Sequence, residues 1–581
     1  MKKNIHTFAK GHRNLIVYGI IGATGALLDL IFYVLFYRYF GIPPVIASFL
    51  SVSIGIINNF ILNSKHNFKV NDKLFFRFVN FYSIGLGGAV FSSAIILVLF
   101  NIFDVNPFIA KLITIVPVVL LQYVLNKKFS FSNLEHENYA SHPLKKLFTK
   151  HYWLIVMNLI FALVSIIFIA NIQPDGTRTA PDEGTHYNYN VKFILDHKRL
   201  PVSGQDDVPL LKACRDTTWG KVPCTYSYQA YPGANYLFAS GTSWILHAVA
   251  GVPNLTGARV ASLLWGLVFV NLLYLMVLRI TKKTGITAII TASIALIPQV
   301  IFSASYVNQD AHSLAIAAFV GYALVRFLQD QRLTSYIIAG VAFGGLLPLA
   351  KFNYFLLCIA VIAVLLFAKI YGKIAWKQIG ILTLWCIGGF IVFASFWYVR
   401  NFLLYNDLLG QSFTLAAMSK YHALGEAKDV SLYTLQQSTQ IDFFETLLRS
   451  FYLAFGPMAF YLSDAAYEII KFCLFSLIFG FFYLLSIVSK TIRKHSLTVF
   501  MGLLVFIALA IGLVYQNATV YDFQPQGRYL YAILVPIALA LAYLYALDKK
   551  FRFISIGFLL ITSYVFFSSF DVIIRKILVV S

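Results

Sequence analysis

Apolar stretches recur along nearly the whole chain, and short polar connections separate them. Many of these stretches approach about 20 residues, which is the length that a helix needs to cross the hydrocarbon core of a bilayer. In lipid, every backbone polar group has to find its partner within the segment, so single spans of this kind are helical. The pattern therefore predicts an all-α integral membrane protein, a polytopic helical bundle with about fifteen spans by hydropathy.

Composition supports the same class of protein. The chain of 581 residues is 59% hydrophobic and 12% charged, whereas soluble domains carry about 25% charged residues. The net charge of +22 is dispersed over short loops instead of forming one patch. Nucleic acid is therefore not an expected partner, and the lipid bilayer is.

The basic residues fall in loops on alternate sides of the predicted spans. Cytoplasmic loops carry such an excess of Lys and Arg, so the pattern places the N-terminus in the cytoplasm of a multi-pass protein of the plasma or inner membrane. These loops contain Lys65, Lys69, Lys73 and Arg77; Lys127 and Lys128; Lys282 and Lys283; Arg326 and Arg332; Lys373 and Lys377; Lys490, Arg493 and Lys494; and Lys549, Lys550 and Arg552.

The spacing of the spans divides the chain into two modules. Residues 1–135 hold four closely connected spans, residues 136–152 form a polar and basic cytoplasmic linker, and residues 153–581 hold the remaining spans. The second module has one long loop, residues 173–255, directly after its first span. Since loops of this length usually carry a function, this external loop is expected to contribute to a site.

Five polar clusters lie at the ends of predicted spans, and the alternation of the spans places all five on the external side. They are Pro181–His186, Asn308–Asp310, Lys351–Asn353, Trp397–Asn401 and Gln526–Tyr529. Charged and amide groups are costly near a bilayer and are rarely placed there without a use. Gathered at one face, these groups would form a polar site above an apolar wall, as chemistry on a lipid-linked substrate requires.

Carboxylates are the candidate catalytic groups of this site. Asp182 and Glu183 are adjacent, so their side chains diverge: one can act as a general base while the other orients the substrate or holds a metal. A solvated acidic turn is the alternative interpretation. Asp310 begins a span, where a carboxylate either caps the helix or contacts the substrate. His186 is expected to form a structural hydrogen bond, contact a phosphate or bind a metal.

Cations at span ends are the candidate substrate-binding groups. Arg400, with Asn401 beside it, and Arg528 have aromatic neighbours, and guanidinium is favoured for bidentate phosphate contacts. Snorkelling to lipid headgroups is the alternative. Gly527 indicates a close backbone approach beside Arg528. Lys351 is a further cation on the side of the membrane where the positive-inside rule disfavours one.

No clustered spacing of Cys and His indicates a dedicated metal site. No cofactor is therefore assigned, although the carboxylates leave room for a divalent metal. Of the five cysteines, Cys214 and Cys224 lie in the long external loop, where a disulfide between them is expected, since disulfides form in oxidising compartments. A zinc pair is the less favoured alternative, because no second pair of ligands is nearby.

The first module contains a weak internal repeat. Its second span ends at Asn63 and leads to Phe68, and its fourth span ends at Asn126 and leads to Phe131. This repeat indicates either duplicated two-helix halves around a lipid path or ordinary interfacial anchoring by aromatic and basic residues.

Asp29 lies inside the first span of this module. An intramembrane carboxylate is a candidate for a functional site, or it bonds to a polar side chain of a neighbouring helix. Together with Asn59 and Asn63, Asp29 is assigned to the candidate lipid-sugar path.

The first module resembles the GtrA family of small four-helix membrane proteins. The resemblance covers residues 10–135 and rests on Tyr18-Gly19, Asp29 inside the first span, Asn59-Phe60-x-Leu62-Asn63 followed by Phe68, and the echo Leu125-Asn126-Lys127-Lys128-Phe129. His66 stands where the family usually has Trp. The resemblance implies a role in moving polyprenyl-phosphate sugars across membranes, or in escorting the enzymes that use them.

Residues 153–581 resemble the GT-C superfamily of multispanning glycosyltransferases. A bacterial branch carries the motifs P-D-E-x-x-H, N-x-D, a Lys-containing turn, W-x-x-R-N and Q-G-R-Y, which correspond in order to the five polar clusters. This resemblance implies an inverting transferase with a polyprenyl-monophosphate sugar (undecaprenyl or related) as donor, Asp182 as base and cations on the lipid phosphate. The acceptor would be a cell-surface glycan, wall polymer or lipid on the extracytoplasmic face. A flippase, transporter or accessory protein without transferase activity is the alternative.

Overall fold

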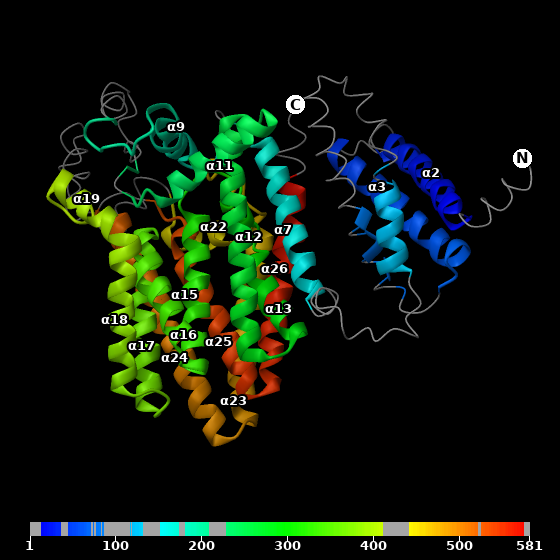
Figure 1. The fold of residues 1–581 in the computed structure, drawn as a ribbon. Helices are drawn as coiled ribbons and strands as arrows, with labels where there is room; N and C mark the ends of the chain where they lie inside the picture. The colour runs from blue at the N-terminus through cyan, green and yellow to red at the C-terminus, as the bar shows by residue number, and fades with distance from the viewer. Residues whose placement is uncertain are drawn as a thin grey trace, which may run out of the picture. The chain divides into compact units, whose positions relative to one another are not determined.

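Figure 1 shows the computed structural model of the chain. It describes residues 13–36, 44–70, 117, 119–131, 151–173, 180–207, 228–229, 231–410, 441–520 and 524–573, with single positions between 74 and 85. In this part of the chain every named element is a helix, and strands are absent apart from one isolated bridge, Phe455 to Phe460. The predicted all-helical class is thus confirmed. The chain divides into two compact units, Met1–Lys150 and His151–Ser581.

Two helices of the first unit, α2 (Arg13–Val34) and α3 (Pro44–Leu62), pack against each other. Their crossing depends on small residues, since a Cβ on Gly55 would lie 2.7 Å from the carbonyl oxygen of Gly25. Such close approach is typical of packed membrane helices. It brings the Ser51 hydroxyl to within 2.5 Å of the Asp29 carboxylate, to which it donates a hydrogen bond. Asp29 therefore has a polar partner on the neighbouring helix, one of the two roles expected for it.

The internal repeat is present in the fold as two equivalent π-helical turns, η2 (Asn63–Asn67) and η3 (Asn126–Ser130). In each turn the first Asn accepts one hydrogen bond from the side chain four residues later and one from the backbone N–H of the following Phe. The bonds are Asn67 to Asn63 (2.9 Å), Ser130 to Asn126 (2.7 Å), Phe68 to Asn63 (2.8 Å) and Phe131 to Asn126 (2.9 Å). The two Phe rings stack with centroids 4.4 Å apart. The two copies of the repeat therefore contact each other at the residues that follow their π-helical turns.

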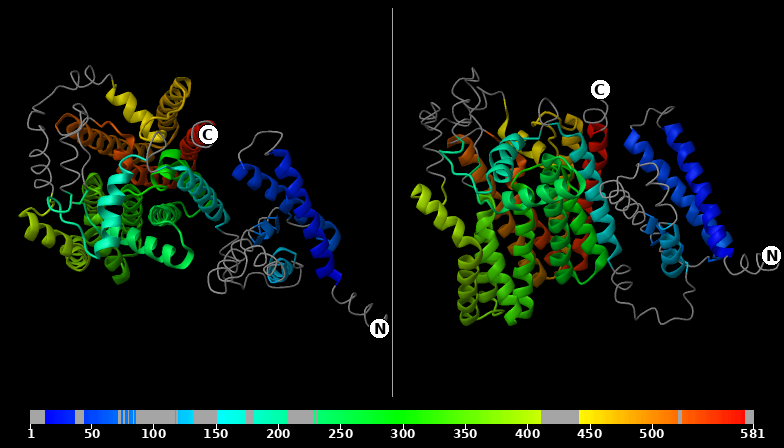
Figure 2. Two further views of the ribbon diagram at one scale, coloured as in Figure 1. Left: turned by 90° about the horizontal axis from the view of Figure 1, so that it is seen from above. Right: turned by 45° about the horizontal axis from the view of Figure 1, so that its top comes forward.

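The second unit is a bundle whose helices run side by side (Figures 1 and 2). Its elements as far as the fourth polar cluster are α7 (Tyr152–Asn171), α8 (Glu183–His186), η5 (Tyr187–Lys192), α9 (Phe193–His197), α11 (Ala234–Ala250), α12 (Asn254–Thr281), α13 (Thr284–Ala295), α14 (Pro298–Ser303), α15 (Asp310–Asp330), α16 (Leu333–Ala339), η6 (Gly340–Leu346), η7 (Leu347–Leu349), η8 (Phe352–Phe355), α17 (Leu356–Ile370), α18 (Trp376–Gly389), η9 (Phe390–Ala394) and α19 (Ser395–Tyr405). They are followed by α22 (Phe443–Tyr452), α23 (Asp464–Ile487), α24 (Lys490–Val520), η11 (Gly527–Ile533), α25 (Leu534–Leu547), η12 (Lys549–Phe551) and α26 (Arg552–Val572).

The described residues contain nine helical segments that are long and apolar enough to cross a membrane. They are Tyr152–Asn171, Asn254–Thr281, Asp310–Asp330, Phe352–Ile370, Trp376–Tyr405, Asp464–Ile487, Lys490–Thr519, Gly527–Leu547 and Lys549–Ser569. Three shorter apolar helices accompany them: Val17–Phe32, Thr284–Ala295 and Leu333–Leu349. The polytopic character predicted from hydropathy is therefore confirmed.

One predicted span is interrupted. Hydropathy predicts a span near residues 285–306, and the structure builds this stretch from two helices, α13 and α14. Pro298 is the first residue of α14, and a proline cannot continue the preceding helix because it lacks a backbone N–H. The nine long helical segments of the described residues are fewer than the about fifteen spans expected from hydropathy, because helices such as α13 are too short to be counted among them and part of the first module's predicted spans lies outside the described residues.

Helices α12, α15 and α25 form the centre of the second unit. The buried share of their apolar windows is 56%, 78% and 61%, whereas it is only 17% in α24. In a membrane protein the exposed apolar side chains of such outer helices face lipid, so burial here reports position in the bundle. The polar clusters at the ends of α15 and α25 are therefore held by the best-packed helices.

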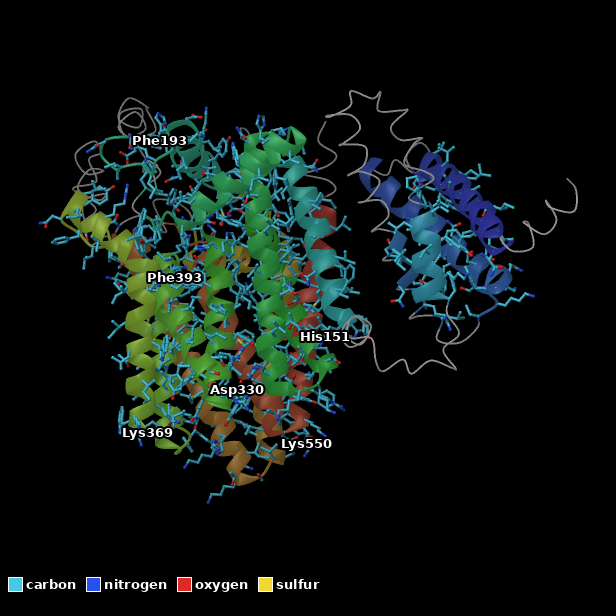
Figure 3. All side chains as sticks on the ribbon, in the orientation of Figure 1. His151, Phe193, Asp330, Lys369, Phe393 and Lys550 are labelled. Atoms are coloured by element: carbon cyan, nitrogen blue, oxygen red, sulfur yellow. The ribbon has the colours of Figure 1, made fainter. Side chains whose placement is uncertain are left out.

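Labelled residues mark the two ends of this bundle in Figure 3. Phe193 of α9 lies at one end, together with α11, while Asp330, Lys369 and Lys550 lie at the opposite end. The latter end is where α15 and α17 finish and where η12 connects α25 to α26. The basic loops of the second module thus lie opposite the end that bears the long loop.

Candidate active site

The loop that follows α7 presents Asp182 in an uncommon backbone conformation. Its φ is 60° and its ψ 2°, in the left-handed region, and it precedes the short helix α8. The backbone N–H of His186 donates to the Asp182 carbonyl at 3.0 Å. Non-glycine residues with positive φ are uncommon and tend to occur at functional sites. The conformation directs the Asp182 carboxylate, whose side chain is 13% exposed, toward the C-terminal part of the unit.

Arg528 lies at the centre of the site and is buried. Its Nη2 donates to Asp182 Oδ2 at 2.7 Å, and its Nη1 donates to the Tyr306 hydroxyl at 2.8 Å. Nη1 also lies 3.7 Å from Asp310 Oδ2, and Nε donates to Gln526 Oε1 at 2.6 Å. One guanidinium therefore joins three of the five polar clusters, and burial strengthens these charge-assisted bonds.

Gly527 explains how Arg528 reaches this position. A Cβ at Gly527 would overlap the backbone of Phe451 and lie 2.6 Å from the carbonyl oxygen of Leu447, both on α22. The Gly527 N–H donates to the Ser450 hydroxyl of the same helix at 2.7 Å. The close backbone approach predicted from the glycine is confirmed. It places the first turn of η11 directly against α22.

Lys351 and Asp310 form the second ion pair of the site. Lys351 Nζ donates to Asp310 Oδ1 at 2.9 Å and lies 4.8 Å from the ring centroid of Tyr529. Burial lowers the pKa of Lys351, and the Asp310 carboxylate partly offsets that effect. The backbone N–H of Asp310 is capped by Asn308 Oδ1 at 2.6 Å. The Asp310 carboxylate is thus directed at the cations, while Asn308 provides the cap.

The charges in this core balance. Asp182 and Asp310 contribute two negative charges, and Lys351 and Arg528 contribute two positive charges, so the sum is zero. Buried charges are tolerated only when they are paired and hydrogen-bonded. We refer to these four residues as the charge cluster.

Glu183 has a partner that the sequence analysis did not identify. Arg259 of α12 donates to it through Nε (2.8 Å, Oε1) and Nη2 (2.6 Å, Oε2), and the Val307 N–H donates to Oε1 at 3.0 Å. The remaining Arg259 donor, Nη1, bonds the carbonyls of Ile169 and Ile172 at the end of α7. Both side chains are buried. This pair ties the loop that presents Asp182 to α7 and α12, which fixes the residue next to Asp182.

His186 is packed behind the loop that presents Asp182. Its Nδ1 lies 2.6 Å from the Tyr236 hydroxyl, and its ring stacks on Tyr228 with centroids 3.9 Å apart. Burial, helped by the nearby charges of Lys351 and Arg528, lowers the pKa of His186 well below its ordinary value. A neutral imidazole in this setting orders the loop, which is the structural role among those expected for it.

The donor set around the charge cluster does not favour a divalent metal. Among the residues that the structure describes, no three His, Cys, Asp or Glu side chains are grouped to hold a metal ion. Both carboxylates of the cluster already face cationic side chains. A divalent ion would have to displace those contacts.

Arg400 and Asn401 bond to two different segments, the external loop and the residues that follow α19. Arg400 Nη2 donates to the Pro201 carbonyl, and the guanidinium lies 5.0 Å from the Trp397 ring centroid. The buried Asn401 donates to the Leu408 carbonyl at 3.4 Å. The backbone N–H of Ser203, in the same loop, donates to the Tyr405 hydroxyl. Helix α19 therefore anchors the external loop, and its arginine contacts that loop and not the charge cluster in the bonds that the described residues show.

The other predicted site residues are distributed as follows. Asn59 and Asn63 are bonded within α3 and η2: the Asn63 side chain donates to the Asn59 carbonyl at 2.8 Å. Cys214 and Cys224 lie outside the described residues. The structure adds four residues that the sequence analysis did not single out, namely Arg259, Tyr306, Tyr228 and Tyr236. Arg259 carried a signal that could have found it, since it is a lone cation in the second turn of an apolar span.

Comparison with known protein families now adds to this geometry. Residues 17–170 match the family model of the GtrA/DPMS transmembrane domain, and residues 237–398 match that of Dolichyl-phosphate-mannose-protein mannosyltransferase. No curated protein and no solved structure matches the chain. The helical fold and these matches identify a membrane protein with a glycosyltransferase domain. More particularly, the chain carries a GtrA/DPMS transmembrane domain followed by a mannosyltransferase-type domain of the GT-C class, and both resemblances noted in the sequence are confirmed.

The extents of the two matches differ from those of the compact units. The first match continues to residue 170 and so includes α7, which packs against α12 in the second unit. The second match contains Asp310, Lys351 and Arg259, while Asp182 and Arg528 lie on either side of it. The site therefore joins residues inside and outside the matched segment.

Proposed function

We propose that the second unit transfers a sugar, with inversion, from a polyprenyl-monophosphate carrier to an acceptor hydroxyl on the extracytoplasmic face. The acceptor belongs to a cell-surface glycan, a wall polymer or a lipid. One observation carries the proposal: a buried guanidinium, Arg528, lies between a candidate base, Asp182, and a second carboxylate, Asp310, beside Lys351. Such a group can serve proton abstraction and phosphate departure at the same place.

In the proposed reaction Asp182 removes the proton of the acceptor hydroxyl. The acceptor oxygen then bonds to the anomeric carbon, the bond from that carbon to the phosphate oxygen breaks, and its electron pair stays on the phosphate. Arg528 and Lys351 stabilise the charge that develops on the departing lipid phosphate, since prearranged cations in a buried site are effective at this task. Attack opposite the leaving group gives inversion.

The remaining residues position these groups. Glu183, through Arg259, holds the loop that presents Asp182. Asp310 holds Lys351 and faces Arg528. His186 packs behind the loop, and Arg400 holds the external loop through the Pro201 carbonyl. Asn401 holds the segment that follows α19 through the Leu408 carbonyl. The test of the function as a whole is mass spectrometry of surface glycans from cells with and without this chain. Loss of one sugar residue would identify substrate and product, and an unchanged glycan profile would contradict transfer.

The proposed membrane orientation can be tested by labelling. Gln205 lies in the external loop and is exposed, whereas Lys282 is an exposed residue of the basic loop between α12 and α13. In a background with the five native cysteines changed to serine, Gln205→Cys should react with an impermeant thiol reagent in intact cells. Lys282→Cys should react only after permeabilisation, because basic loops are cytoplasmic. The opposite labelling pattern would rule out an extracytoplasmic site.

The two arginines at span ends should differ in their tolerance to lysine. We expect Arg528→Lys to lose at least tenfold in activity, about 1.4 kcal/mol of transition-state stabilisation, because lysine cannot reproduce the planar fork. Arg400→Lys should lose less than about threefold, since lysine can still donate to the Pro201 carbonyl and keeps its charge. Both variants should keep the wild-type melting temperature. Equal losses would place Arg400 on the lipid phosphate as well, as its sequence motif alone suggests.

A flippase for lipid-linked sugars is the second candidate, and it applies to the first unit. The specific observation in its favour is the duplicated turn, in which η2 and η3 carry equivalent hydrogen bonds and meet at Phe68 and Phe131. Internal repeats of this kind are common in transporters. Accumulation of the sugar donor in a strain that carries Asp182→Asn, and depletion of extracytoplasmic donor after deletion of the first unit, would assign transport to the first unit and transfer to the second.

A further inference from the structure

The ion pair between Asp182 and Arg528 connects the two halves of the proposed reaction. Arg528 Nη2 donates to Asp182 Oδ2 at 2.7 Å, and Nη1 and Nε donate to Tyr306 and Gln526. The guanidinium is 3% exposed and Asp310 is fully buried. The Nη2 donor that faces Asp182 is therefore engaged by the carboxylate while Asp182 is charged.

We propose that binding of a polyprenyl phosphate monoester at this site is coupled to the uptake of one proton by Asp182, which releases Arg528 to the phosphate. The inference rests on the proposed function only for the identity of the ligand. It adds that Asp182 and the phosphate bind the Arg528 guanidinium alternately. The ligand class is a lipid phosphate dianion, the leaving group of the transfer.

Charge balance is the physical reason. The charges of the charge cluster sum to zero, so a bound dianionic phosphate would give the buried site a net charge of about −2, which is costly in a medium of low dielectric constant. One proton on Asp182 reduces that net charge to about −1 and breaks the ion pair between the carboxylate and Arg528 Nη2. The guanidinium can then donate to the phosphate oxygens, which it matches in geometry.

The same exchange balances the charges during turnover. The proton that Asp182 accepts comes from the acceptor hydroxyl, while the electron pair of the broken bond adds one negative charge to the phosphate. Asp182 is therefore protonated as the phosphate gains its negative charge. Arg528 then exchanges its hydrogen bond to Asp182 for one to the phosphate. When the lipid phosphate leaves, Asp182 loses the proton and regains Arg528.

Other titratable groups surround Asp182 and have to be distinguished from it. His186 is neutral, since burial lowers its pKa well below the ordinary value, and burial raises the pKa values of Tyr228 and Tyr306. These three groups keep one protonation state between pH 7.5 and 8.5. Lys351 is the other group that has to be distinguished from Asp182 as the proton acceptor, because burial lowers its pKa.

The test measures binding of undecaprenyl phosphate to the detergent-solubilised full chain. A phosphate monoester loses its second proton near about pH 6, so the lipid is a dianion at pH 7.5 and 8.5. Coupling to one proton predicts about tenfold tighter binding at pH 7.5 than at pH 8.5. Calorimetry in two buffers of different ionisation enthalpy should show uptake of about one proton per bound lipid.

Three variants decide whether Asp182 is the proton acceptor. Asp182→Asn should bind the lipid phosphate with the same affinity at both pH values and without proton uptake. Lys351→Arg, which keeps the charge, should retain the uptake. Asp330→Asn, at the opposite end of the bundle, is the matched control and should behave as the wild type.

The result that would overturn the inference is equally specific. Wild-type binding without proton uptake, no binding at all, or unchanged uptake in Asp182→Asn would each refute it. Loss of uptake in Lys351→Arg would assign the proton to Lys351 instead. A protein that shows the predicted uptake but transfers no sugar would uphold this inference while contradicting the proposed function.

Discussion

Replacing Asp182 by asparagine is expected to reduce sugar transfer by about 10²–10⁴-fold, the usual cost of losing a general base. The amide has nearly the shape of the carboxylate and can still accept the Arg528 hydrogen bond through its oxygen, but it cannot take the acceptor's proton. Initial rates with a polyprenyl-phosphate sugar donor, measured on purified wild-type and variant protein, give the comparison. Donor binding should remain measurable in the variant.

Asp196→Asn is a suitable control for this experiment. Asp196 is also an acidic residue of the external loop, but it is exposed on helix α9, so its loss should leave transfer nearly unchanged. Surface substitutions of this kind usually change stability little. Full activity of Asp182→Asn would remove that residue from the mechanism. Glu183 would then have to be reconsidered as the base, although its two oxygens are bonded to Arg259 and Val307.

The sequence predicted the charge cluster well because all four of its members lie at span ends. Alternation of spans assigns each end to one side of the membrane, so Asp182, Asp310, Lys351 and Arg528 could be grouped without knowing any contact. The contacts themselves could not be predicted. Asp182 and Arg528 are 346 positions apart in the chain, and only the packing of the central helices brings them together.

Two other features lay beyond a reading of hydropathy and spacing. Arg400 belongs to a motif that resembles the site residues, yet its backbone partner, the Pro201 carbonyl, depends on how the external loop folds. The division of residues 285–306 follows from Pro298, but hydropathy averages over a window and does not register a single proline. The predictions therefore failed at individual contacts and at a single proline, and not in the overall arrangement of spans.

Arg259 is a residue whose role could not be predicted from the sequence. Its neighbours along α12 are small or apolar, and its partner Glu183 is 76 positions earlier in the chain. The sequence analysis treated Glu183 as a group that contacts substrate or metal. In the structure both carboxylate oxygens of Glu183 accept hydrogen bonds from Arg259. Arg259 was not among the predicted site residues.

Removing the charge of Arg259 is expected to have the largest effect on stability. Arg259→Gln would leave the Glu183 carboxylate buried without its ion pair, and breaking a buried pair in this way costs about 3–5 kcal/mol. We expect a clear fall in melting temperature, measured by thermal unfolding of the detergent-solubilised protein, together with loss of transfer. The effect follows from burial, because both side chains are almost inaccessible to solvent.

A second variant separates stability from positioning. Glu183→Leu combined with Arg259→Met removes both charges and should recover much of the lost melting temperature, since replacing a buried ion pair by apolar groups is often neutral or stabilising. If the pair only stabilises the fold, transfer should recover with it. If it holds Asp182 in place, kcat should stay at least about tenfold below the wild type, a loss of about 1.4 kcal/mol, while the KM for the donor changes little. We expect the second outcome, because Arg259 bonds the end of α7 and the residue next to Asp182 at the same time.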